Sequence, residues 1–325
     1  MKSSSLLPSD FLKSLGVLEW GYTEESIPLT FKQYEDWVHN ADHGPLSYLA
    51  DERKDLRKDL KLVYPEFQSS VVFLFGYQET KKWLLEEEKH DIAGYALGFG
   101  GADYHYELKH RLNTIFEKLK EHIPDLERFV ALDAQPVLER DLAFRAGLGW
   151  FGKNSMLIHR REGSYFLIGS LLLNRKLDVS TDKIDTDHCG QCRACIDACP
   201  TDAIDVENRT IVAARCISTY TIETFKEAPA PVGFENSRGE IFGCDICQDV
   251  CPWNRKPLAR VMSVLHFKEN FQFLKEWFFE MPREKLKDMI EENSNRGFRK
   301  QLLGTAFDRP GKEGWLKNLK ARLKK

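Results

Sequence analysis

The placement of the cysteines restricts the fold of this chain more than any other feature. All eight cysteines lie between positions 189 and 251 of 325 residues. Residues 188–200 read HCGQCRACIDACP, which has the spacing C-x2-C-x2-C-x3-C-P. In this spacing three thiolates surround one 4Fe–4S cluster and the fourth reaches a second cluster. Zinc sites usually pair two C-x2-C groups, so the pattern favours iron–sulfur clusters over zinc.

A second cysteine group completes this arrangement. It consists of Cys216 and the segment CDICQDVCP at 244–252, and it resembles a ferredoxin repeat whose first ligand has moved upstream through an insertion. Two clusters would use every thiol of the chain. Zinc, or one cluster with spare thiols, is the remaining alternative. We expect one cluster on Cys189, Cys192, Cys195 and Cys251, and the other on Cys199, Cys216, Cys244 and Cys247.

The composition is that of a globular protein of the cytoplasm. Apolar residues make up 42% and charged residues 30% of the chain, which is ordinary for a folded domain. No apolar run approaches the roughly 20 residues of a membrane span. The N-terminus, MKSSSLLPSDFLKSLGVLEW, has no signal-peptide pattern. We therefore expect a cytoplasmic protein with no membrane partner, in which a disulfide framework is disfavoured.

The charge of the chain is uneven. The net charge is −3, but residues 296–325 contain ten Lys or Arg against two acidic residues, which is +8 and leaves −11 for the remainder. Such asymmetry is typical of a chain with an anionic partner near its basic end. A solvated amphipathic helix at the chain end is the alternative.

The cysteine-free first half reads as a mixture of strands and helices. The β-branched and aromatic run at 69–77 predicts a buried strand, and 128–134 predicts a short one. Apolar residues recur on one face of a helix over 104–123, and Pro136 and Gly147 delimit a second helix over 136–149. Residues 155–174 alternate around a turn, as in a long hairpin. This mixture favours an α+β fold over a doubly wound parallel sheet.

Three segments together resemble a known family. They are LDAQPVLERDLAFRAGLGWFGKNSMLI (132–158), GADYHYEL (101–108) and the split cysteine groups. The chain is similar over about residues 10–260 to epoxyqueuosine reductases, which are cobalamin-dependent iron–sulfur enzymes of the last step of queuosine synthesis in tRNA. The resemblance implies a nitroreductase-like cobalamin domain (1–178), a ferredoxin-like domain with two 4Fe–4S clusters (179–262) and a short basic helical segment (263–325) in place of the HEAT-like repeats of longer members.

The resemblance also implies roles for single residues. Asp133 falls at the position of the family's proton donor beside the cobalt. The expected partners are a tRNA anticodon stem-loop with epoxyqueuosine and an external electron donor such as a flavodoxin or ferredoxin system, and the chain is expected to be a monomer. The positions that match cobalamin contacts in the family are Arg57, Ala96, Asp133, Leu157, Ile168, Ser218 and Asp245.

The chemistry of the reaction explains why an acid is needed. Converting an epoxide to an alkene takes two electrons and two protons, and a cofactor must supply the electrons. Burial of Asp133 in an apolar pocket would hold its carboxyl group neutral, because desolvation disfavours the carboxylate. A helix N-cap is the other reading of this residue. We expect the neighbouring Glu139, Arg140, Asp141 and Arg145 to form a solvated or structural helix face.

Two other functions remain open from the sequence. A related cobalamin and iron–sulfur reductase of a small molecule, similar to reductive dehalogenases, would share the cofactors but not the tRNA. A non-enzymatic two-cluster electron carrier would bind no cobalamin. The size of the N-terminal half and its similarity to the reductases favour the tRNA enzyme over both.

Overall fold

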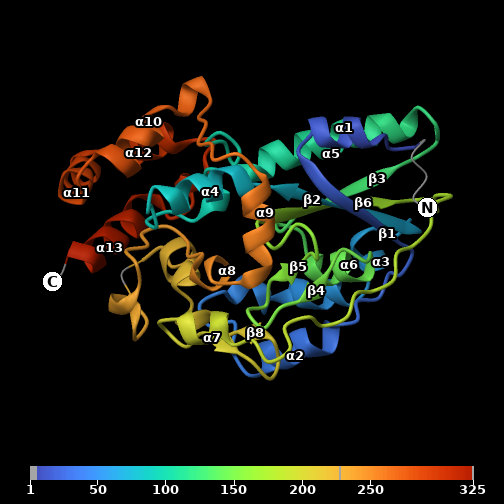
Figure 1. Ribbon diagram of the computed structural model, residues 1–325, viewed down its shortest axis with the longest axis horizontal. Helices are drawn as coiled ribbons and strands as arrows, with labels where there is room; N and C mark the ends of the chain where they lie inside the picture. The colour runs from blue at the N-terminus through green and yellow to red at the C-terminus, as the bar shows by residue number, and fades with distance from the viewer. Residues whose placement is uncertain (1–5, 227, 324–325) are drawn as a thin grey trace.

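The structure, a computed structural model, describes residues 6–226 and 228–323. Within them, the first half is built on a sheet with the strand order β1–β2–β6–β3 (Figure 1). Its strands pair antiparallel throughout, which confirms the predicted α+β class. The strands are β1 (Val17–Thr23), β2 (Ser69–Gly76), β6 (Phe166–Leu173) and β3 (Arg128–Ala131).

Helices cover both faces of this sheet because its central strands are mostly apolar on both sides. Phe73 and Phe75 of β2 face the layer of α1 (Ser9–Ser14) and α5 (Tyr104–Lys120). Val72 and Leu74 point to the opposite face, toward α6 (Glu139–Arg145), since successive residues of a strand alternate. The apolar face predicted for the helix over 104–123 is buried in α5; its residues are Leu108, Leu112, Ile115, Phe116 and Leu119.

Two elements differ from the sequence prediction. Residues 155–174 do not form one long hairpin, because β6 has both edges occupied by β2 and β3. Instead β5 (Leu157–Ile158) pairs with β4 (Trp150–Phe151). The helix predicted over 136–149 is the shorter α6, since residues 132–138 form a loop closed by its own turn hydrogen bonds, including that from the Leu132 amide to Gln135 Oε1 at 2.8 Å.

The cysteine-rich region consists of short elements joined by loops. They are α7 (Ala194–Ala198), β7 (Ile204–Asp205), β8 (Thr210–Ile211) and α8 (Ile246–Asp249). Figure 1 shows this region beside α2 (Phe31–His39) of the first half. The indole Nε1 of Trp37 donates to the carbonyl of Ile211 at 2.8 Å, which joins the two regions.

The C-terminal segment packs against both preceding regions. Its aromatic residues Phe307 and Trp315 share a core with Leu84 of α4 (Gln78–Glu86) and with Phe242 of the cysteine-rich region. Across the described residues, no helix combines the length and the apolar character that crossing a membrane requires. The remaining helices are α3 (Leu60–Val63), α9 (Arg255–Arg260), α10 (Phe273–Lys275), α11 (Arg283–Glu292), α12 (Asn295–Leu302) and α13 (Gly311–Leu323).

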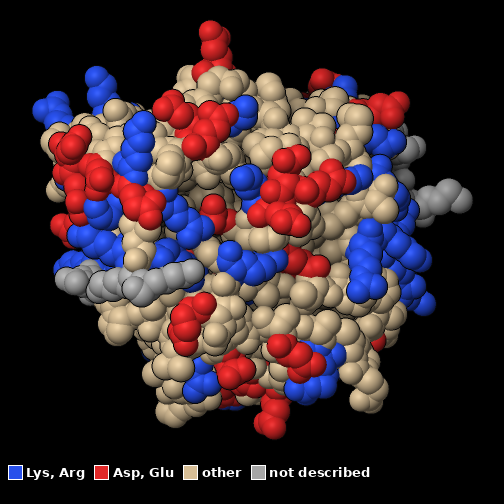
Figure 2. Space-filling model, turned by 60° about the vertical axis from the view of Figure 1, so that its left-hand side comes forward, with Lys and Arg blue, Asp and Glu red and all other residues tan. Residues whose placement is uncertain are grey.

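Much of the positive charge of the C-terminal segment holds the segment in place. Lys317 donates to the carbonyl of Thr224 at 2.6 Å, and Arg322 donates to the carbonyl of Glu240 at 3.0 Å. Lys320 pairs with Glu291 at 3.2 Å. Figure 2, turned so that this side comes forward, shows basic and acidic side chains interspersed over the surface. These three cations are therefore committed to contacts within the chain, whereas the sequence left an anionic partner and a solvated amphipathic helix as alternatives for this segment.

Candidate active site and cluster-binding sites

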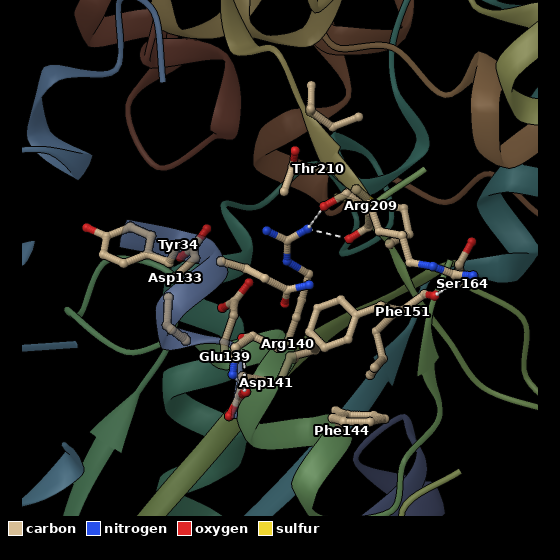
Figure 3. Close-up of a pocket in the computed structure, with 18 of the residues that line it drawn as sticks. Tyr34, Asp133, Glu139, Arg140, Asp141, Phe144, Phe151, Ser164, Arg209 and Thr210 are labelled. Atoms are coloured by element: carbon tan, nitrogen blue, oxygen red, sulfur yellow. Dashed lines mark hydrogen bonds between the residues drawn. The ribbon is translucent and has the colours of Figure 1, made fainter. Parts of the chain in front are cut away.

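A cavity of about 870 Å³ lies between the α6 face of the sheet and the cysteine-rich region. Its walls come from α2, from the loop and helix at 133–144, from β6, and from residues 208–219 (Figure 3). Pockets that hold small molecules and cofactors typically measure about 300–1,000 Å³. This cavity is large enough to receive a large cofactor with part of it projecting outward.

Two polar groups of the cavity wall lack partners. Nη1 of Arg57 and Nε1 of Trp150 are buried and make no hydrogen bond to the described residues. Buried donors without partners cost about 1–3 kcal/mol each. A cofactor that brings amide or phosphate oxygens into the cavity would satisfy both, so the donor set fits the cobalamin expected from the sequence.

Four of the seven positions matched to cobalamin contacts line this cavity: Arg57, Asp133, Leu157 and Ile168. Ala96 is buried in the core beneath the C-terminal segment, with 1% of its surface exposed. Ser218 is outside the lining, although its neighbour Thr219 belongs to it.

Asp245 has a different role from the predicted cofactor contact. Its carboxylate is buried at the interface between α4 and the cysteine-rich region. It accepts from Lys81 Nζ at 2.8 Å and from the amide of Gly94 at 2.8 Å. Lys81 also pairs with Asp249 at 2.7 Å. These contacts use Asp245 to join the two regions, away from the cavity lining.

Asp133 projects into the cavity from the loop after β3, with 39% of its side chain exposed there. Its Oδ1 lies 2.5 Å from His105 Nε2, and its Oδ2 accepts from the hydroxyl of Tyr104. Burial alone would raise the pKa of Asp133, but the bonds from His105 and Tyr104 outweigh it and the pKa is lowered. The expected neutral carboxylic acid is therefore wrong for this state: Asp133 is an ionised partner of His105.

His105 keeps its proton in this pair. Burial opposes the charge, but hydrogen bonds to Asp103 and Asp133 raise the pKa of His105 to about 9. Arg309, from the C-terminal segment, lies 2.7 Å from His105 Nδ1 and 3.0 Å from Asp103 Oδ1, and its guanidinium stands over the ring of Tyr104. Asp103 in turn caps α5 by accepting from the amide of His105. The C-terminal segment therefore contacts the start of α5, where Tyr104 and His105 bind Asp133.

The charged residues at the start of α6 are not a solvated face. Asp141 and Arg145 form a buried pair at 2.5 Å, and Asp141 also accepts from the amide of Thr30 at 2.8 Å. Arg140 donates to Ser155 Oγ at 2.6 Å. Glu139 lines the cavity. The opposite charges have the predicted spacing along α6, but their side chains are directed toward the interior of the protein.

One group of four thiols surrounds a smaller cavity of about 70 Å³. Lys153 lies at its edge and donates to the carbonyls of Gly190 and Cys192 at 2.7 and 2.9 Å. In the described part of the chain, no three His, Cys, Asp or Glu side chains are arranged to hold a single ion. The thiols are those expected for the first cluster: Cys189, Cys192, Cys195 and Cys251.

The other four thiols form a second, more deeply buried group. Burial and then the charges of nearby thiols, including Cys216 and Cys199, raise the pKa of Cys247. Burial likewise raises the pKa of Cys244, with contributions from Cys247 and Cys216. Thr219 and Gln248, which lie close to these thiols in the chain, line the large cavity. Chain neighbours of the second group therefore form part of the cavity wall, although none of its four thiols lines the cavity.

Trp150 connects the first thiol group to the same cavity. It lines the cavity, packs in one apolar cluster with Cys251, and stands edge-on to Trp253 with ring centroids 4.8 Å apart. The first thiol group is thus connected through Trp150 to the cavity that contains Asp133. This geometry also brings into the site Glu139, which the sequence placed on a helix face, and Trp150, which the sequence did not single out.

Comparisons with known proteins agree with this architecture. Residues 188–254 match a family model described as "4Fe-4S double cluster binding domain". Residues 57–133 match one described as "Epoxyqueuosine reductase QueG, DUF1730". An epoxyqueuosine reductase of Cyclobacterium marinum is 36% identical over 98% of this chain and 94% of its own length.

Solved structures share the fold. One is a Bacillus subtilis epoxyqueuosine reductase whose aspartate-bearing catalytic loop is swung out of the active site. It is 25% identical, with a TM-score of 0.74, over 97% of this chain and 79% of that chain. Another is an epoxyqueuosine reductase with an epoxyqueuosine-modified tRNA-Tyr stem loop. It is 24% identical, with a TM-score of 0.71, over the same shares of the two chains.

Proposed function

The chain belongs to the epoxyqueuosine reductase family, and on this premise we propose that it reduces epoxyqueuosine to queuosine in the anticodon loop of a tRNA. It is an oxidoreductase with a double 4Fe–4S cluster domain. The proposal extends this to cobalamin in the large cavity, electrons delivered through both clusters from an external donor, and Asp133 as a proton donor. The observation that carries it is the position of Asp133 in a cavity that is also lined by Trp150, which packs against Cys251 of the first thiol group.

In this proposal, different residues of the cavity bind the cofactor and transfer the proton. Arg57 and Trp150 offer buried, unpaired donors to the cofactor, and Leu157 and Ile168 supply an apolar wall. Bound and reduced, cobalamin supplies the electrons that break the two carbon–oxygen bonds. Asp133 faces the cavity with a proton shared through His105. A proton delivered to the leaving oxygen typically accelerates such a step by 10²–10⁴-fold.

The tRNA partner is proposed from the substrate. An anticodon loop offers an unstacked base that can enter a cavity, together with a phosphate track. The related structure with a modified stem loop has the same fold.

The test is an anaerobic conversion assay on tRNA that carries epoxyqueuosine. Protein loaded with both clusters and a strong reductant is compared with and without cobalamin, and nucleosides are analysed by mass spectrometry. Loss of one oxygen only with cobalamin supports the proposal. Asp133→Asn should retain the clusters and cobalamin but lose turnover. Cobalamin binding without conversion would favour a small-molecule reductase, and no cobalamin binding would favour an electron carrier.

A further inference from the structure

Glu139 contributes a carboxyl group to the cavity. The chemistry proposed above gives this carboxyl group no role. It is the first residue of α6 and lines the cavity together with Asp133. Figure 3 shows its side chain extending from the helix into the cavity on the side of Asp133. Within the described residues its carboxyl group makes no hydrogen bond or ion pair, whereas Arg140 is held by Ser155 and Asp141 by Arg145.

The surroundings of Glu139 and Asp133 shift the pKa values of their carboxyl groups in opposite directions. Burial, and next the charge of Asp133, raise the pKa of Glu139 to about 8. The facing cations Arg140 and His105 lower it, but less strongly. The pKa of Asp133 is lowered because the bonds from His105 and Tyr104 outweigh burial. Two carboxyls whose environments separate their pKa values in one site are the usual mark of divided acid–base roles.

The proposed reaction needs two protons at the same atom. An epoxide, two electrons and two protons give an alkene and one molecule of water. Both carbon–oxygen bonds break, the carbons retain one electron pair as the new double bond, and the oxygen leaves with both protons. The electrons come from the external reductant through the clusters and cofactor. Asp133 and His105 share one proton between them, so a second donor is required.

Resting on the proposed reductase function, we propose that Glu139 is the second acid of the site. It donates one of the two protons that the leaving oxygen takes, and the His105–Asp133 pair donates the other. Glu139 is placed for this because it shares the cavity with Asp133 and has no partner that competes for its proton. A carboxyl group serving only the fold would be expected to have hydrogen-bond partners, as Asp141 has.

Glu139→Gln removes the acid and keeps the shape of the side chain. The matched control is Glu223→Gln. Burial also raises the pKa of Glu223, and Asp133 acts on it as well, but Glu223 is outside the cavity lining. Both variants are prepared as full chains loaded with both clusters. Their iron content and cobalamin affinity should match those of the unmodified protein.

The first measurement detects the proton on the carboxyl group of Glu139. Infrared spectra between pH 6 and pH 10 should show a protonated carboxyl band that titrates near pH 8. The band should vanish in Glu139→Gln, persist in Glu223→Gln, and titrate at lower pH in Asp133→Asn, since the Asp133 charge helps to raise the pKa. A band that persists in Glu139→Gln would overturn the assignment.

The second readout is single-turnover conversion of epoxyqueuosine tRNA across the same pH range. We expect Glu139→Gln to be about 100-fold slower at pH 7, and the fall in rate that the unmodified protein shows near pH 8 should disappear. Glu223→Gln should keep both the rate and the fall. An unchanged rate and pH profile in Glu139→Gln would overturn the inference alone. If the unmodified protein converts nothing, the proposed function fails and the inference fails with it.

Discussion

His105 Nε2 and Asp133 Oδ1 lie 2.5 Å apart, and this ion pair joins the start of α5 to the loop after β3. The histidine holds the proton and the aspartate faces the cavity, with its other oxygen bonded to Tyr104. We propose that the pair acts as one proton store. Its two members come from the elements that precede and follow β3 in the chain, α5 and the loop at 132–138.

Replacing His105 should slow proton transfer without weakening the binding of the cofactor. We expect His105→Gln to lower single-turnover conversion by about 100-fold, because Asp133 loses the group that recharges it. Cobalamin affinity should remain within about twofold. His110→Gln, at an exposed position of the same helix, is the control and should behave as the unmodified protein does. Equal rates in the two variants would exclude His105 from the proton store.

The raised pKa of His105 should also appear in the stability of the fold. The pKa rises from an ordinary 6.5 to about 9 on folding. The pair therefore stabilises the folded chain fully below pH 6.5, and the stabilisation is lost as pH rises through 9. The shift corresponds to at most about 3 kcal/mol. Anaerobic denaturant unfolding of the unmodified protein and of His105→Gln should give a free-energy difference that shrinks between pH 6.5 and pH 10; a constant difference would contradict the pairing.

Arg309 should tune this pair from the C-terminal segment. Its guanidinium lies 2.7 Å from His105 Nδ1 and also pairs with Asp103, the other acidic partner of the histidine. In Arg309→Gln we expect the pKa of His105 to rise, because the Arg309 charge lowers it, and conversion to slow on the order of 10-fold through misalignment. Histidine-selective NMR titration measures the first effect. Arg299→Gln, an exposed arginine paired with Asp308, should change neither quantity.

Local sequence patterns predicted the elements that depend on neighbours in the chain. The apolar periodicity of α5 and the β-branched run of β2 are complete within each segment, and both elements form as expected. The spacing of Cys189, Cys192 and Cys195 is likewise local, because one short segment places these three thiols around the smaller cavity. The hairpin at 155–174 failed for the opposite reason, since the pairing of β6 depends on strands far away in the sequence.

The functional details missed by the sequence all depend on distant contacts. Asp141 accepts a hydrogen bond from Thr30, which is 111 positions away in the chain. This contact brings the start of α6 inward and places Glu139 in the cavity. Asp245 is held by Lys81, 164 positions away. A helix-face reading treats such charges as solvated because it sees only i, i+4 neighbours. Family resemblance located Asp133, whereas its ionised state follows from His105 and could be read only in three dimensions.

The crossed use of the two cysteine groups can be tested by paired substitutions. Cys251 lies with Cys189 around the smaller cavity although the two belong to different motifs. The double variant Cys189→Ser with Cys251→Ser should lose half of the bound iron, because both thiols serve one cluster. Cys244→Ser with Cys251→Ser should lose nearly all of it. Iron analysis and low-temperature electron paramagnetic resonance distinguish the schemes, and the opposite result would show that each motif binds its own cluster.

The buried lysine between α4 and the cysteine-rich region should control how firmly the two hold together. Lys81 is 2% exposed and pairs with Asp245 at 2.8 Å and Asp249 at 2.7 Å. Lys81→Met leaves Asp245 buried without its cation, whereas Asp249 keeps Arg238 at 2.7 Å. Breaking a buried pair in this way typically costs about 3–5 kcal/mol.

The neighbouring Lys82 provides the matched control, because it is more exposed and lies 3.9 Å from Glu86. We expect Lys82→Met to change the unfolding free energy by less than about 1 kcal/mol. Anaerobic unfolding of the cluster-loaded variants measures both values. Because Asp245 directly follows Cys244, a proposed ligand of the second cluster, Lys81→Met should also release iron faster under a chelator. Similar stabilities and iron-release rates in the two variants would show that the interface does not depend on this ion pair.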